Sequence, residues 1–205
     1  MSFLEECWEE REVKQYKEIF ETIGDGIYPI SREIFGKLNT DAIDPRWLTH
    51  GVFVSPPSEK RNTWAYVTSG MSNPWESEAP EEYSGLGMEF VLETNQESNW
   101  AIEVLQTLMA YNLLIAAGKK GEATLLDYGD RVPLGLSESI TTMMFTHPIN
   151  FPESFTIKSG DVDLIQVIGI TADELTLAKD TSSNAVRNKI INETGGLITS
   201  IVSNS

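Results

Sequence analysis

The sequence has few of the residues that build disulfides and metal sites. Its only cysteine is Cys7, and its only histidines are His50 and His147. A single cysteine cannot form an internal disulfide, which is typical of proteins of the reducing cytosol. A structural zinc site needs four cysteine or histidine ligands, so these three residues cannot supply one. We therefore expect a cytoplasmic protein without a structural metal.

Basic residues are also scarce. The chain carries 15 lysines and arginines against 31 aspartates and glutamates, which gives a net charge of −16 at pH 7. Nucleic acids and anionic membranes both require a basic surface, so we expect neither as a partner. A strongly acidic protein instead attracts a basic protein partner over long range.

A long uninterrupted hydrophobic run is missing. The most apolar segment, residues 100–118, contains Glu103, Gln106, Thr107 and Asn112. These polar residues make it a poor membrane span and a good buried helix. The N-terminal residues MSFLEECWEERE lack the basic and apolar regions of a secretory signal, so we expect no export.

Hydrophobic spacing predicts the main helices. Residues 4–23 form an amphipathic pattern that Gly24 can end, and a second helix runs from Ser98 or Asn99 to about Ala117. In the sequence TADEL, Thr171 and Glu174 form a capping box, which predicts helical turns from there to about residue 192.

Runs rich in β-branched and aromatic residues predict the strands. Residues 51–54 and 63–69 are expected to form a hairpin, and residues 85–93 a strand. A second hairpin turns near Ser159 and Gly160, and GGLITSIVS at 195–203 is a final candidate strand. Helices and strands are mixed without strict alternation. We therefore expect an α+β fold, with a mixed, mainly antiparallel sheet packed with helices, in one domain over residues 1–205.

The stretch YSGLGMEFVL at 83–92 raises the question of a nucleotide site. A dinucleotide loop needs a third glycine between a strand and a helix, but Phe90 occupies that position and the strand follows the glycines. No glycine-lysine-serine or glycine-lysine-threonine sequence is present either, so a P-loop is excluded. We expect no nucleotide and no other cofactor.

The same stretch fits a strand better. One face would carry the core residues Leu86, Met88, Phe90 and Leu92. On the other face Gly85 and Gly87 would leave the strand open. Strand glycines mark either a bend or the close approach of another backbone, and both interpretations remain possible at this point.

An acidic window is the clearest candidate for a binding site. No basic residue occurs between Arg61 and Lys119, a stretch that holds eight glutamates. Four of them share the polar loop 73–84 with two aromatic residues that are candidate anchors for a partner. The alternative is a solvated acidic face with both aromatics packed against the core. The candidate partner-binding residues are Trp75, Glu76, Glu78, Glu81, Glu82, Tyr83, Gly85 and Gly87.

Signals for catalysis are weak. The sequence GLSES at 135–139 is one residue away from the Gly-x-Ser-x-Gly nucleophile motif. A hydrolase using Ser137 and His147 is therefore one alternative, and it requires the two side chains to lie within hydrogen-bond reach. Another alternative is a purely structural or oligomerising domain, and the sequence does not indicate the oligomeric state. We expect a protein that is not an enzyme.

Several segments resemble the suppressor of fused family. SGLGMEFVL followed by WAIEVLQTLMAY is similar to a strand and helix of that family, with Glu103, Gln106, Leu108 and Tyr111 matching the helix pattern. The segment GDVDLIQVIGITADEL resembles another family segment, with Ile165 where leucine is usual. WAYVTSGMS and GGLITS resemble two further strands. The resemblance covers roughly residues 45–202.

The resemblance implies a curved sheet and a protein-binding function without catalysis. The animal family member binds an extended peptide between two domains, but this chain resembles only the first of them. Stand-alone members look bacterial, and some are thought to act as toxin-immunity proteins. The family also implies that loop 73–84 and strand 85–93 form the recognition region.

Overall fold

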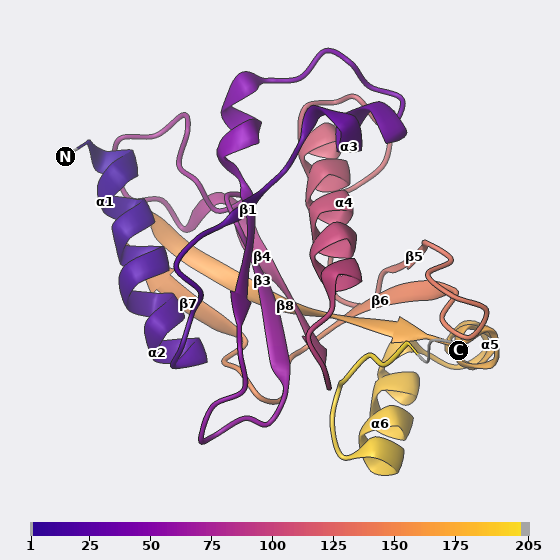
Figure 1. Ribbon diagram of the computed structural model, residues 1–205. Helices are drawn as coiled ribbons and strands as arrows, with labels where there is room; N and C mark the ends of the chain where they lie inside the picture. Colours follow the sequence, from indigo (N-terminus) through magenta and orange to yellow (C-terminus); the bar gives the residue numbers. More distant parts are fainter. Residues whose placement is uncertain (1, 202–205) are drawn as a thin grey trace.

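The computed structural model describes residues 2–201, which form helices and one eight-stranded sheet (Figure 1). The helical segments are α1 Phe3–Glu9, the π-helical η1 Glu10–Gln15, α2 Tyr16–Phe20, α3 Arg32–Lys37, the 3-10 helix η2 Pro45–Thr49, α4 Asn99–Ala116, α5 Ala172–Asp180 and α6 Ser183–Thr194. The strands are β1 Tyr28–Pro29, β2 Gly51–Ser55, β3 Trp64–Ser69, β4 Tyr83–Thr94, β5 Arg131–Pro133, β6 Thr142–Thr146, β7 Ser154–Ile157 and β8 Gly160–Ile170.

The sheet has the order β1-β2-β3-β4-β8-β6-β5, and β7 pairs with the first half of β8. Only β4 and β8 run parallel, and every other pair is antiparallel. The predicted α+β class with a mainly antiparallel sheet is therefore confirmed. Both predicted hairpins are also present, as β2 with β3 and as β7 with β8.

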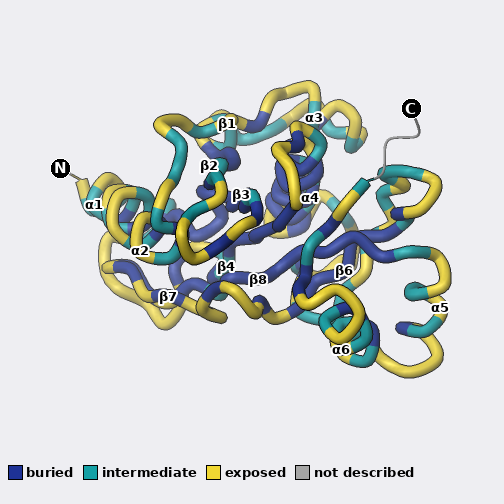
Figure 2. Tube along the Cα trace, turned by 60° about the horizontal axis from the view of Figure 1, so that its bottom comes forward, coloured by how far each residue is buried: buried dark blue, intermediate teal, exposed yellow. Residues whose placement is uncertain are grey.

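Helices pack on both faces of the sheet. Most of the strand residues are buried, as Figure 2 shows. Helix α4 packs on one face, where Phe90 and Leu92 of β4 belong to the larger apolar cluster. The N-terminal helical segment packs on the other face, where Val91 lies in a second cluster with Tyr16 and Phe20. A third cluster joins α5 and α6 to β6 and the end of β8. Helix α4 is thus the predicted buried helix.

The predicted helix over 4–23 is one continuous helical segment with a π-helical turn in its middle. A π-helical turn bonds residue i to residue i+5, and the Tyr16 amide indeed donates to the Arg11 carbonyl. Residues five apart are thereby brought towards one side, and both Arg11 and Tyr16 are buried against the sheet. The segment ends at Phe20, before the predicted Gly24, because Glu21 takes a positive φ and its carboxylate binds Ser58 and Lys60.

The glycines of β4 form a bulge. Gly85 and Gly87 have φ values of +58° and +74°, and the pairing of β4 with β8 shifts register between Tyr83 and Met88. A Cβ at Gly85 would lie 2.6 Å from the Asn73 carbonyl oxygen. Both interpretations of the glycines therefore apply, since the strand bends and the chain's own backbone approaches closely.

Two predictions about strands are wrong. The face of β4 opposite the core was expected to be open, but Glu89, Val91 and Glu93 on that face are fully buried under the N-terminal helical segment and neighbouring loops. The final strand at 195–203 is only an isolated bridge from Ile198 to Glu93, and its last two residues lie outside the described part. The Thr171 and Glu174 capping box is confirmed.

Candidate functional site

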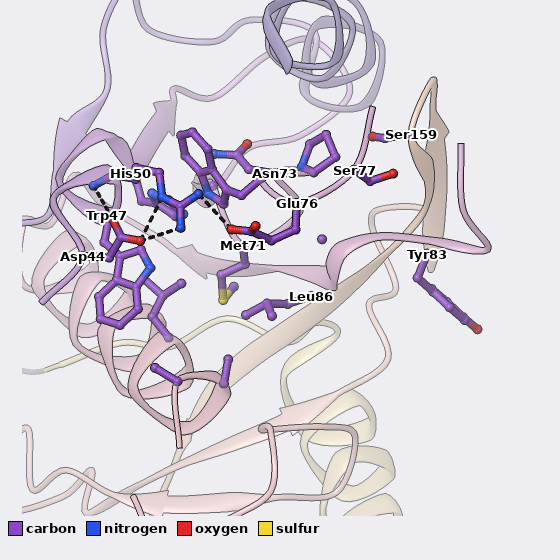
Figure 3. Close-up of a pocket in the computed structure, with 18 of the residues that line it drawn as sticks. Asp44, Trp47, His50, Met71, Asn73, Glu76, Ser77, Tyr83, Leu86 and Ser159 are labelled. Carbon is purple, nitrogen blue, oxygen red and sulfur yellow. Dashed lines mark hydrogen bonds and ion pairs between the residues drawn. The ribbon is translucent and has the colours of Figure 1, made fainter. Parts of the chain in front are cut away.

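A pocket of about 440 Å³ lies between the segment 44–50, the loop 70–85 and the C-terminal end of α4 (Figure 3). Five of the candidate residues line it, namely Trp75, Glu76, Glu81, Tyr83 and Gly85. The structure does not bring the other three into the pocket. Glu78 and Glu82 are exposed elsewhere on the same loop, and Gly87 is buried within β4.

The walls of the pocket are largely apolar. Met71 and Leu113 are almost fully buried there, and both belong to the main apolar cluster. The remaining apolar lining residues are Trp47, Pro74, Leu86, Ala116 and Ala117. The pocket is thus an opening in the side of the α4 core, and an apolar group that entered it would lose contact with water.

The segment 44–50 is held by a short 3-10 helix. Asp44 caps it by accepting a hydrogen bond from the Arg46 amide at 2.9 Å, and Pro45 fits the first helical position. Phe35 of α3 stacks on Trp47 with ring centroids 5.6 Å apart. This packing places Arg46 at the rim of the pocket and His50 at its inner wall.

Arg46 is engaged by two carboxylates. Its guanidinium lies 2.7 Å from Asp44 and 2.9 Å from Glu76 and also packs over the Trp75 ring at 5.3 Å. The hydrogen bonds from Arg46 lower the pKa of Asp44 below its usual range. Since Glu81 also lines the pocket, its rim carries three carboxylates against one guanidinium. The rim therefore repels anions.

Trp75 is half-buried and does not project into solvent as an anchor would. Its ring makes an edge contact with Trp8 at 5.9 Å and a stacked contact with His50 at 5.9 Å. Tyr83, in contrast, is 49% exposed and points away from the residues around His50 (Figure 3). Of the two aromatics, one is therefore packed inward and one is available at the surface.

His50 is fully buried although it is a polar residue. Burial lowers the pKa of His50 to about 4, helped by the positive charge of Arg11 and opposed by backbone groups of Arg46 and Gly70. Gly70 is required beside it, since a Cβ there would lie 2.2 Å from the imidazole. Backbone groups of Arg46 and Gly70 lie close to the His50 ring, but within residues 2–201 neither ring nitrogen forms a hydrogen bond of standard geometry, and the same holds for Nε1 of Trp75.

A buried charge network lies behind the pocket. Glu89 accepts hydrogen bonds from the hydroxyls of Thr68 and Ser72 and from the amides of Gly70 and Ser72, at 2.6 to 2.9 Å. Arg11 lies 4.0 Å from this carboxylate. These bonds satisfy a charge that would otherwise be costly to bury, and they fix the loop that begins at Gly70.

The network reaches the pocket through Asn73. The Asn73 side-chain oxygen accepts from Arg11 at 2.7 Å and from the Trp8 indole at 2.8 Å. Asn73 itself lines the pocket. The N-terminal helical segment therefore holds the pocket wall in place from the far side of the loop.

The structure does not bring Ser137 and His147 together as hydrogen-bond partners. The Ser137 hydroxyl lies 3.0 Å from that of Ser139, whereas His147 stacks on Tyr128 at 3.9 Å and lies 3.5 Å from Glu153. The hydrolase alternative therefore lacks its first geometric requirement. The described part of the chain also contains no cluster of three or more potential metal ligands.

Comparison with known proteins identifies the family. The model of the suppressor of fused protein family matches residues 46–202. The chain belongs to the suppressor of fused family. This match agrees with the resemblance of the individual segments, and it begins just at the pocket segment and leaves out the N-terminal helical segment. A search of curated protein sequences found no significant match.

Solved structures share the fold. A suppressor of fused homologue from Neisseria gonorrhoeae superposes with a TM-score of 0.64 at 16% identity, over 97% of this chain and 96% of its own. A structure of a Sufu–Fu complex superposes with a TM-score of 0.58 at 19% identity, over 85% of this chain and 90% of the matched chain. Drosophila Suppressor of Fused superposes with a TM-score of 0.57 at 19% identity, over 87% of this chain. This chain spans only about half of the Drosophila chain, with 51% of it covered.

Sequence reasoning missed the inner wall of the pocket. Asp44, Arg46, Trp47 and His50 were not candidates, although they come from one short segment, DPRWLTH. The aspartate and proline at its start signal a helical turn, but no local pattern shows what that turn faces. Arg11 was missed as well. The two glutamates in the apolar strand 88–94 were a usable signal, since buried carboxylates need partners.

Proposed function

We propose that this chain is a non-enzymatic protein-binding module of the suppressor of fused family that recognises a basic partner with the acidic loop 73–84. The partner-binding residues are the four loop glutamates, the exposed Tyr83, and Trp75 and Gly85 at the pocket. Regulation of a partner, or neutralisation of a toxin, is the role that such binding would serve in the cytoplasm.

The observation that carries this proposal is the exposed charge on the loop. Glu78, Glu81 and Glu82 are exposed without a basic partner among the described residues, and only Glu76 forms an ion pair, with Arg46. Solvent-facing carboxylates of one sign raise the association rate with a basic surface. Membership of a family in which Sufu is seen in complex with Fu supports protein binding.

Strand addition at the glycines of β4 is less favoured than the acidic loop. Here β4 already pairs with β8 on one side, and on the other the Leu86 amide donates to the Met71 carbonyl. The sheet ends at the short strands β1 and β5, and among the described residues β7 pairs only with β8, so it forms a further short edge. Binding by strand addition relies on backbone hydrogen bonds and would not depend on the loop charges, so the same experiment separates the two modes.

The experiment replaces Glu76, Glu78, Glu81 and Glu82 together by glutamine. Proteins retained by the immobilised wild-type chain from a lysate of its native host are identified by mass spectrometry. The affinity of the identified partner is then measured over a range of NaCl concentrations. We expect the loop variant to bind about tenfold more weakly at low salt, with a flatter salt dependence, because exposed charge pairs each contribute modestly.

A matched control removes the same amount of charge elsewhere. Glu103, Glu122, Glu138 and Asp180 are exposed and are replaced by the corresponding amides. If this control weakens binding as much as the loop variant, the effect belongs to net charge and not to the loop. An unchanged affinity and salt slope in the loop variant would reject the acidic loop as the binding surface.

A further inference from the structure

The pocket beside loop 73–84 is open to solvent and is lined mainly by apolar side chains (Figure 3). Of these, Met71 and Leu113 are almost fully buried, Trp47 and Leu86 are half-buried, and Ala116 is exposed. An apolar group that filled the pocket would cover the parts of Trp47, Leu86 and Ala116 that water now reaches. Removing that apolar surface from water is favourable.

The buried polar side chains of the pocket wall are out of reach or already engaged. His50 is fully buried, so its ring is not accessible from the pocket. The side-chain oxygen of Asn73 accepts hydrogen bonds from the N-terminal helical segment, and the Ser159 hydroxyl is hydrogen-bonded to that of Ser84. The interior of the pocket therefore favours a group without polar atoms, because a polar atom buried there would need a partner.

The rim of the pocket carries negative charge that the chain does not neutralise. Asp44 and Glu76 are both paired with Arg46, at 2.7 and 2.9 Å. Glu81 also lines the pocket, is exposed, and forms no ion pair within residues 2–201. The neighbouring loop glutamates add to this charge. A cation that approaches the pocket is therefore attracted, and an anion is repelled.

The loop that carries these charges is fixed at both ends. The Glu81 amide donates to the Ser159 carbonyl at 3.0 Å, and the Asp161 amide donates to the Glu82 carbonyl at 3.0 Å. At the other end, Asn73 is held by its hydrogen bonds to the N-terminal helical segment. The pocket therefore exists before a partner arrives, and little conformational entropy is lost in forming it.

We propose that the pocket takes one apolar side chain, such as leucine, from a segment of a partner protein that carries lysine or arginine on either side of it. Its volume of about 440 Å³ lies near the lower end of the range of about 300–1,000 Å³ that is usual for ligand pockets, which suits a side chain. The apolar side chain packs against Leu86 and Ala116, and the flanking cations lie near Glu81. This site rests on the proposed function, because the acidic loop defines the basic partner, and it adds the residue that anchors that partner.

The test uses three capped peptides on the full chain. They are Arg-Gly-Leu-Gly-Arg, Arg-Gly-Ala-Gly-Arg, which lacks the apolar side chain, and Glu-Gly-Leu-Gly-Glu, which reverses the charge. Binding is followed by NMR, through the methyl resonances of Leu86, Leu113 and Ala116. We expect the leucine peptide with arginines to bind about tenfold more tightly than the alanine peptide, because leucine buries a larger apolar area. The glutamate peptide should bind least.

The variant Ala116→Leu fills part of the pocket without removing a buried side chain. It should reduce the preference for the leucine peptide over the alanine peptide, because the added side chain occupies the same space. Ala172→Leu, at an exposed position at the start of α5 outside the pocket, is the matched control. It should leave the affinities of all three peptides unchanged.

Equal affinities of the leucine and alanine peptides would overturn the site, as would the absence of binding at millimolar concentration or methyl shifts that lie away from the pocket. A leucine preference that persists in Ala116→Leu would also place the anchor elsewhere. If only the leucine preference fails and the arginine peptides still bind more tightly than the glutamate peptide, the acidic-loop proposal stands. If the glutamate peptide binds as tightly as the leucine peptide with arginines, the basic flanks and the acidic-loop proposal are both rejected.

Discussion

At the scale of single residues, folding holds His50 in a charge state that it would not keep in water at mildly acidic pH. Its imidazole lies in the apolar interior beside Gly70, and the guanidinium of Arg11 disfavours a second positive charge nearby. A protonated His50 would have to be buried without a carboxylate hydrogen-bonded to it. The protein must therefore expel or rearrange this side chain when it takes up a proton.

This leads to a prediction about pH. The pKa of His50 falls from its ordinary 6.5 to about 4 on folding, so between these values the unfolded chain binds more protons. The contribution of His50 to stability is fully present above about pH 6.5 and is lost as the pH falls towards 4. The loss amounts to roughly 3 kcal/mol at most. Urea unfolding of the wild-type chain and of His50→Gln, from pH 7 to pH 4, measures it.

The difference between the two chains isolates His50, because all the carboxylates titrate in both. We expect the variant to be less stable than the wild-type chain at pH 7. The difference in their free energies of unfolding should narrow as the pH falls. A gap that stays constant down to pH 4 would show that His50 keeps an ordinary pKa in the folded state.

At the scale of elements, the bulge in β4 positions the loop that carries the acidic residues. The Leu86 amide donates to the Met71 carbonyl at 2.8 Å, and the Ser84 hydroxyl donates to the Ser72 carbonyl at 2.6 Å. Both bonds cross the space next to Gly85, where no side chain fits. The two ends of loop 73–84 are thereby held together.

Gly85→Ala should therefore be strongly destabilising. The new Cβ would lie 2.6 Å from a backbone oxygen, and φ is +58°. We expect a loss of about 2 kcal/mol or more, measured by urea unfolding, since strained conformations cost of the order of 1–3 kcal/mol and the contact adds to that. Gly118→Ala is the control, because Gly118 has a φ of +70° but open space around it. This variant bears only the conformational cost and should lose about 1 kcal/mol of unfolding free energy. Equal losses in the two variants would mean that crowding at Gly85 has no energetic weight.

The elements also show how far sequence reasoning reached. Helix α4, both hairpins and the core face of β4 were predicted because periodicity and capping are local signals. The covered face of β4 was not predicted, because the residues that cover it are distant in sequence. Arg11 lies 78 positions before Glu89, and Asn150 lies 57 positions after Glu93. The pocket was missed for the same reason. It joins three segments that are distant in sequence, and only the loop 73–84 was indicated by its acidic composition.

At the scale of the whole molecule, charge repulsion opposes folding. The 31 acidic residues outnumber the 15 lysines and arginines, so even complete pairing would leave 16 carboxylates without a basic partner. The ion pairs that do form lie mostly at the surface, such as those of Lys37 with Glu33 and Lys189 with Glu193. Surface ion pairs contribute about 0–1 kcal/mol each to the stability of the folded protein. Added salt weakens these pairs, but this lowers the stability only slightly. Repulsion among the remaining carboxylates is the larger effect, and folding brings those charges closer together.

Salt should accordingly stabilise the folded protein. Raising NaCl from about 0.01 M to about 1 M shortens the Debye length from about 30 Å to about 3 Å, which screens the repulsion between exposed carboxylates. We expect the Tm to rise by several degrees, and KCl to act like NaCl because screening is not specific to the cation. The chain with four loop glutamates replaced by glutamine should start from a higher Tm at low salt and gain less from added salt. A Tm that falls with salt would instead show that the surface ion pairs outweigh the net negative charge.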